Sequence, residues 1–272
     1  MHEPIRSSYH THSHYCDGQG QISEMIEAAI AAGLTEVGIS SHAPLPFETE
    51  WTMPPERLAD YVKEVHQLQE RYHDRIRVLF GAEIDFIPGS GVAAYQEQVI
   101  FPLGFDYFVG SVHFLGRQDP PRSFDGTEQE FREILRDDYD GDIEAMAVDY
   151  YHRIRQVPSI PGVKIIGHLD LIKRWNAERT YFTGNEPWDL AAIEETLQSI
   201  AASGLLVELN TAGWRKGLGE PYPSLPILTR CHDLGIPVTV NSDAHTPGDV
   251  AAGFEQARSL LVDIGIVPVS LA

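Results

Sequence analysis

The sequence contains few cysteines and few basic residues. Its two cysteines, Cys16 and Cys231, are far apart and have no metal-type spacing. A disulfide framework and a zinc finger are therefore excluded, and a reducing compartment is expected. Lysine and arginine total 20 against 40 aspartates and glutamates, which gives a formal net charge of −20. Because this charge repels nucleic acid phosphates, we expect no nucleic acid partner.

Long apolar runs are also missing. No stretch approaches the roughly 20 apolar residues that cross a bilayer, and the N-terminal residues lack the apolar centre of a signal peptide. We therefore expect no membrane partner and a cytoplasmic location. The sequence has no Walker lysine loop and no G-x-S-x-G elbow. A loose glycine-rich match at 89–94 follows Pro88 instead of opening a helix directly after a strand, so it does not indicate dinucleotide binding.

What the sequence does contain is a regular alternation of strand and helix patterns. Seven segments rich in β-branched and apolar residues predict buried parallel strands: 5–10, 35–40, 76–84, 106–112, 163–168, 205–210 and 236–241. Helical patterns lie between them, and the region 128–156 predicts one long or broken helix. The alternation predicts an α/β fold in which one domain, residues 1–272, forms a (β/α)7 TIM-like barrel. A doubly wound open sheet is the alternative architecture.

Histidines and carboxylates mark the ends of these strands. Six of the seven predicted strands end on one of them, and the carboxyl ends of barrel strands meet on one face. His10 and His12 are two residues apart, as are Asp243 and His245, so each pair can point to one side of its strand. Glu83 follows an apolar run, where a buried carboxylate is costly unless it is paired or binds a metal. The remaining strand ends carry His42, His113 and His168. Any one of these histidines alone is more often structural, but together they predict a multinuclear metal site.

Loops beyond the strand ends carry further candidates. Arg174, Arg215 and Lys216 follow two of the predicted strands, and guanidinium forks match phosphate oxygens, so we expect these cations to clamp an anionic substrate. The alternative for each is a solvent-exposed loop charge. His14 lies in the first loop and is a candidate for proton transfer, and the alternative is a solvated loop histidine.

The ordered set of motifs resembles that of the polymerase and histidinol phosphatase (PHP) superfamily. The matching residues are His10-Thr11-His12 with Asp17, then His42, then Glu83 in Ala-Glu-Ile-Asp, then Ser242-Asp243-Ala244-His245. Two further segments, Gly110-Ser111-Val112-His113 and Gly167-His168-Leu169-Asp170, resemble motifs of its histidinol-phosphate phosphatase branch. The resemblance spans nearly the whole chain.

This resemblance implies a distorted seven-stranded barrel that holds three divalent metal ions, zinc, iron or manganese. One ion would be bound by His10, His12, Glu83 and Asp243, a second by Glu83, His113 and His168, and a third by Asp17, His42 and His245. The implied substrate is the small phosphomonoester L-histidinol phosphate, attacked by a hydroxide that bridges two metals. Arg174 and Arg215 would polarise the phosphoryl group, and Glu48 or Asp85 would recognise the ammonium or imidazole.

Four other functions stay open at this point. The chain could be a PHP-type phosphodiesterase or nuclease, a phosphatase for another small phosphomonoester, an amidohydrolase-type deaminase, or a metal-stabilised scaffold without activity. The acidic composition argues against a nuclease. The additional ligands argue against a deaminase: Asp17, His42, Glu83 and His245. The sequence leaves the physiological metals and the oligomeric state open.

Overall fold

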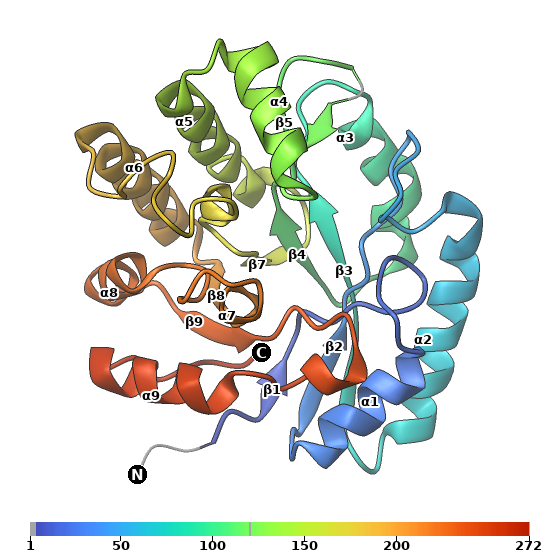
Figure 1. Ribbon diagram of the computed structural model, residues 1–272. Helices are drawn as coiled ribbons and strands as arrows, with labels where there is room; N and C mark the ends of the chain where they lie inside the picture. Colours follow the sequence, from blue (N-terminus) through green and yellow to red (C-terminus); the bar gives the residue numbers. More distant parts are fainter. Residues whose placement is uncertain (1–3, 120, 272) are drawn as a thin grey trace.

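The computed structural model describes residues 4–119 and 121–271. Seven parallel strands form a nearly closed barrel with helices around it, a distorted (β/α)7 TIM-like α/β fold (Figure 1). The strands pair in chain order: β1 (Ser7–Ser8), β2 (Glu36–Ile39), β3 (Arg77–Asp85), β4 (Tyr107–Ser111), β7 (Val163–Ile166), β8 (Leu206–Asn210) and β9 (Val238–Asn241). The predicted fold class is confirmed. Each predicted strand region contains one strand of this sheet, except that β3 extends one residue beyond the predicted 76–84.

The first and last strands approach each other at the barrel seam. The His12 amide donates to the Ala244 carbonyl at 2.8 Å, and the Ala244 amide donates to the His10 carbonyl at 3.3 Å. The Tyr9 amide donates to the Asn241 side-chain oxygen at 2.7 Å. These bonds join the segments that follow β1 and β9, as a closed barrel requires and an open sheet does not.

The helices pack around the outside of the barrel (Figure 1). They are α1 (Ile22–Ala31), α2 (Leu58–Tyr72), α3 (Val92–Tyr95), α4 (Glu128–Tyr139), α5 (Ile143–Ile154), α6 (Pro187–Ser203), α7 (Ala212–Arg215), α8 (Leu225–Asp233) and α9 (Phe254–Ile264). The region 128–156 forms two helices because Asp140 and Gly141 have positive φ values of 55° and 79°. Thr127 and Asp142 then cap α4 and α5, each accepting an amide hydrogen bond. Among the described residues, no helix is long and apolar enough to cross a membrane.

A small antiparallel hairpin was not expected from the sequence. Strands β5 (Phe114–Leu115) and β6 (Arg122–Ser123) form within the long connection that follows β4. Both β5 residues are buried, whereas both β6 residues are half-buried. Such two-residue strands give too short a pattern to be recognised in a sequence.

The lower part of the barrel interior is filled by a small apolar cluster. It consists of Tyr9, Leu79, Tyr107, Val109, Ile165 and Leu271, all buried. The Tyr107 hydroxyl donates to the Tyr9 carbonyl at 2.6 Å. Its ring has room only because Gly38 and Gly81 lack side chains, since a Cβ on either would come within 2.0 or 2.3 Å of a Tyr107 atom. This packing leaves the carboxyl ends of the strands for polar residues.

Candidate metal centre

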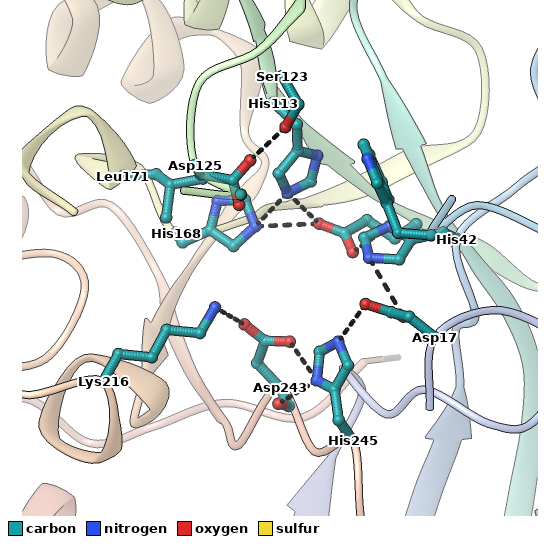
Figure 2. Close-up of a pocket in the computed structure, with 13 residues that line it drawn as sticks. Asp17, His42, His113, Ser123, Asp125, His168, Leu171, Lys216, Asp243 and His245 are labelled. Atoms are coloured by element: carbon teal, nitrogen blue, oxygen red, sulfur yellow. Dashed lines mark hydrogen bonds and ion pairs between the residues drawn. The ribbon is translucent and has the colours of Figure 1, made fainter. Parts of the chain in front are cut away.

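The structure brings all of the predicted metal ligands to one end of the barrel (Figure 2 shows several of them). Each comes from a loop or strand end: His10, His12 and Asp17 after β1, His42 after β2, Glu83 in β3, His113 after β4, His168 after β7, and Asp243 with His245 after β9. Most are buried, whereas Asp17 and His245 are partly exposed at the mouth, with 34% and 28% of the side chain accessible. The parallel strands therefore gather these residues as a barrel should.

Glu83 lies at the centre of the cluster, and its two oxygens face different histidines. Oε2 is 3.0 Å from His10 Nε2, 3.0 Å from His42 Nδ1 and 3.4 Å from His12 Nε2. Oε1 is 3.0 Å from His168 Nε2 and 3.5 Å from His113 Nε2. This is the arrangement that lets one carboxylate serve two neighbouring cations.

A second part of the cluster lies toward the mouth. Asp17 Oδ1 is 3.9 Å from both His12 Nδ1 and His42 Nε2, and its Oδ2 is 3.3 Å from His245 Nε2. His12, Asp17, His42 and His245 each offer one ligand atom, all within 4.8 Å of one another. His10, His168 and Asp243 form another such group. The described residues thus provide several overlapping sets of possible ligands.

The electrostatics of the cluster favour a bound cation. Burial alone would lower the pKa of His10 and that of His113, but Glu208 and Glu83 raise the pKa of His10, and Asp85 and Glu83 raise the pKa of His113. A metal ion would displace the protons of these rings. Burial alone would raise the pKa of Glu83, but the imidazoles of His10, His42 and His113 hold that pKa well below its usual range. His12 Nε2 and His42 Nδ1 are buried and lie 3.4 and 3.0 Å from Glu83 Oε2, yet neither makes an aligned hydrogen bond among the described residues. Ionised carboxylates and imidazole nitrogens are the donors that zinc, iron and manganese accept. The cluster can therefore hold metal ions.

Two buried carboxylates outside the predicted ligand set orient the histidines. Glu208, fully buried in β8, lies 3.0 and 3.1 Å from His10 Nδ1 through its two oxygens and accepts the His168 amide at 2.8 Å. Asp85 Oδ1 lies 2.9 Å from His113 Nδ1 and accepts the His113 amide at the same distance. Such partners fix the orientation of a ligating ring and increase its basicity. Glu208 was not among the residues predicted from the sequence, although an acid inside Leu-Val-Glu-Leu-Asn gives the same signal as Glu83.

A cavity of about 160 Å³ lies over the cluster. Its wall contains four side chains that are not among the predicted metal ligands and carry a polar or aromatic group: Trp51, Ser123, Asp125 and Lys216. The Ser123 hydroxyl donates to Asp125 Oδ1 at 2.8 Å, and Lys216 Nζ is 3.9 Å from Asp243 Oδ2 (Figure 2). The rings of Trp51 and His42 pack edge to face, with 4.5 Å between the ring centres. Only the length of the loops 43–55 and 114–127 indicated that residues such as Trp51 and Asp125 would reach the site.

The two predicted arginine clamps hold backbone carbonyls beside the cavity and do not line it. Arg174 donates to the Lys216 carbonyl at 3.3 Å and lies 4.2 Å from the centre of the Trp175 ring. Arg215 donates to the carbonyls of Ser242 and Asp243 at 2.6 and 3.1 Å. The basic side chain that does line the cavity is Lys216. Direct contact of either arginine with a substrate stays a prediction.

The other predicted substrate residues lie away from the cavity wall. His14 is half-buried beside the Tyr15 ring, with 4.4 Å between ring centres, and Glu48 is exposed. Asp85 contacts Nδ1 of the His113 ring, whereas the other ring nitrogen, Nε2, faces Glu83. None of the three lines the cavity, and their expected roles in proton transfer or substrate recognition stay predictions.

Comparison with known proteins places this geometry in a family. The PHP domain matches residues 8–212. The chain belongs to the PHP family. A relative from Deinococcus radiodurans, named "Probable histidinol-phosphatase", is 32% identical over 259 residues, which cover 94% of this chain and 92% of the relative. This similarity assigns the chain to the histidinol-phosphatase branch of the family.

Solved structures show the same fold. The crystal structure of a "putative histidinol phosphatase" from Listeria monocytogenes superposes with a TM-score of 0.84 at 25% identity. The superposition covers 92% of this chain and 99% of that one. A histidinol phosphate phosphatase from Lactococcus lactis, solved with zinc, L-histidinol and phosphate, gives a TM-score of 0.73 at 22% identity over 97% and 95% of the two chains. Both likenesses extend over nearly the full chain.

Proposed function

We propose that residues 1–272 form a single PHP domain that hydrolyses L-histidinol phosphate to L-histidinol and phosphate in histidine biosynthesis. Residues 1–3, 120 and 272 of that span lie outside the described residues. The observation that carries the proposal is Glu83, whose two oxygens face separate groups of histidines. The name and the nearly full coverage of the Deinococcus relative support histidinol phosphate as the substrate.

We assign three divalent ions, zinc, iron or manganese, to the cluster. His10, His12, Glu83 and Asp243 would hold one ion, Glu83, His113 and His168 a second, and Asp17, His42 and His245 a third. Ligand atoms of the last set lie within 4.8 Å of one another, as do those of His10, His12 and Glu83. Bound cations would supply a nucleophile at neutral pH and neutralise charge on the phosphoryl oxygens.

The residues of the chain then bind and orient the substrate. Lys216 lines the cavity, and its ammonium can donate to a phosphoryl oxygen. Arg215 acts as a positioning residue, because its bonds to the Ser242 and Asp243 carbonyls fix the segment that carries Asp243. Arg174 positions Lys216 through the Lys216 carbonyl in the same way.

Asp125 is the residue that we propose to recognise the cationic part of the substrate. It lines the cavity outside the proposed ligand set, and the Ser123 hydroxyl holds one of its oxygens at 2.8 Å. Its other oxygen can accept from the ammonium of L-histidinol phosphate. Asp125→Asn should therefore raise KM for this substrate by roughly tenfold while leaving KM unchanged for a phosphomonoester without a cationic group, such as p-nitrophenyl phosphate.

We also propose a cytoplasmic enzyme with a small-molecule substrate and neither nucleic acid nor membrane as a partner. The net charge of −20 is unfavourable for contact with phosphate backbones. Cys16 and Cys231 are both free thiols, as expected in a reducing compartment.

The test is phosphate release by the metal-loaded protein from three substrates. L-Histidinol phosphate should be cleaved with a much higher kcat/KM than p-nitrophenyl phosphate or bis-p-nitrophenyl phosphate. Glu83→Gln should abolish this activity, whereas Glu27→Gln, which changes an exposed carboxylate paired with Arg75, should retain it. Preference for the diester would support the phosphodiesterase alternative, and no release from any of the three would support the inactive scaffold.

A further inference from the structure

A second, larger cavity lies beyond the turn that follows His168. It has a volume of about 620 Å³ and is bounded by α6, the loop 176–187 and the segment 218–227. Part of its wall is apolar, with Leu190, Ile193 and Ile227. None of the proposed metal ligands lines it, so the proposed reaction does not account for this space.

Asp189 is an unpaired carboxylate in the wall of this cavity. It lies in the first turn of α6 and is only 2% exposed. Its Oδ1 is buried without a hydrogen-bond partner, and no bond to either oxygen occurs within residues 4–119 and 121–271. Burial, together with the charges of Asp170 and Glu186, raises the pKa of Asp189 to about 7. An ion pair with a cation would strongly stabilise the ionised form of this buried carboxylate.

The nearby basic side chains are already engaged. Lys173 Nζ contacts Asp170 Oδ2 at 2.8 Å, Glu220 Oε1 at 3.0 Å and the Pro221 carbonyl at 2.9 Å. Two of these contacts are hydrogen bonds and the third, with Asp170, is an ion pair, so the ammonium is engaged by all three groups. Arg230, on α8, makes a bidentate pair with Glu194 at 2.7 and 2.8 Å. Neither cation is available to Asp189.

Arg179, which also lines the cavity, is a cation without a partner among residues 4–119 and 121–271. It is exposed, and its guanidinium forms no ion pair or hydrogen bond with any other residue in the part of the chain that the structure describes. The wall of the cavity thus combines an unpartnered carboxylate, apolar side chains and a guanidinium without a partner among the described residues.

We infer that this cavity binds a small primary amine of amino-acid size, with its ammonium on Asp189 and its carbon skeleton against the wall formed by Leu190, Ile193 and Ile227. A ligand that also carries a carboxylate gains a second ion pair with Arg179, which makes a free amino acid the best-matched class. This inference does not depend on the proposed function, because the cavity shares no residue with the proposed metal ligands.

The test is a titration of the metal-loaded protein followed by amide chemical shifts. The probes are 3-methylbutylamine, the neutral 3-methylbutan-1-ol of the same shape, and L-leucine. We expect saturable shifts around the first turns of α6, with a Kd of roughly 1–10 mM for the amine and at least about tenfold weaker binding of the alcohol. Arg179→Gln should weaken binding of L-leucine and leave binding of the amine unchanged.

Variants of α6 separate cation recognition from simple filling of an apolar space. Asp189→Asn should weaken binding of the amine at least about tenfold, whereas Glu195→Gln, which removes an exposed charge from the same helix, should not. Ile193→Trp, which fills the cavity, should abolish binding of the amine without any change to Asp189. Equal shifts with amine and alcohol, shifts confined to the metal centre, or no saturation up to roughly 100 mM would each overturn the inference.

Discussion

Replacement of Glu208 tests how far metal binding depends on a residue outside the proposed ligand set. Glu208 is fully buried and accepts side-chain bonds from Asn210 and Asn241, both at 2.8 Å, in addition to its contacts with His10 and the His168 amide. Glu208→Gln keeps the size but turns one acceptor oxygen into an NH2 group. That group must then face a donor on either side. At Oε1 it would oppose the His168 amide and the Asn210 side chain, and at Oε2 it would oppose the Asn241 side chain.

The loss can be estimated from the bonds that change. Replacing the charged hydrogen bond to His10 and placing two donors in opposition should cost about 2–3 kcal/mol in the folded site. Loss of a partner of a ligating histidine typically lowers metal affinity or activity by about 10–100-fold. We therefore expect Glu208→Gln to reduce kcat/KM for L-histidinol phosphate by that factor and to weaken zinc binding to a similar extent.

The assay is phosphate release at increasing zinc concentration, with the bound zinc measured in parallel. Excess zinc should restore part of the lost activity, because the ligands themselves are intact. Glu27→Gln serves as the control for removal of a carboxylate at the surface. Wild-type activity and zinc affinity in Glu208→Gln would refute the role of this residue in orienting His10.

Three further predictions concern metal removal, pH and packing. Dialysis against a chelator should abolish phosphate release, and added zinc, manganese or iron should restore it. For Asp189, whose pKa is raised from 3.8 to about 7, the unfolded chain loses its proton before the folded one. The wild-type free energy of unfolding should therefore fall as the pH rises between these values. In urea unfolding at about pH 8, Asp189→Asn should be more stable than wild type by on the order of 2–4 kcal/mol. At about pH 4 this difference should be absent. Gly38→Ala should lower the melting temperature and reduce the free energy of unfolding by about 1–3 kcal/mol, because the new Cβ would lie 2.0 Å from the Tyr107 hydroxyl. Gly33→Ala is the control: the space around Gly33 is open, so this variant should show only the smaller cost of its positive φ.

The barrel and the clustering of the histidines could be predicted because both follow from short-range patterns. The strands read as apolar runs, and a residue at the end of a buried parallel strand has only one face of the barrel to point to. The pair His10 and His12 illustrates this, since alternation along the strand alone directs both rings to the same side. Glu208 could have been found by the same reasoning that identified Glu83.

The substrate side of the site could not be predicted, because it depends on how long loops fold. Asp125 enters the cavity through the loop after the β5–β6 hairpin, which has no distinctive sequence pattern. Arg215 has the residue type of an anion clamp, yet its guanidinium is taken up by the carbonyls of Ser242 and Asp243. Residue type and distance from a strand end do not show which backbone groups compete for a long side chain.

The most direct test of the metal cluster is anomalous diffraction at the zinc edge from a crystal of zinc-loaded protein. The account predicts several anomalous peaks among the side chains around Glu83, with occupancies that fall in Glu83→Gln. A map without peaks in this cluster, from protein that still releases phosphate from L-histidinol phosphate, would contradict it.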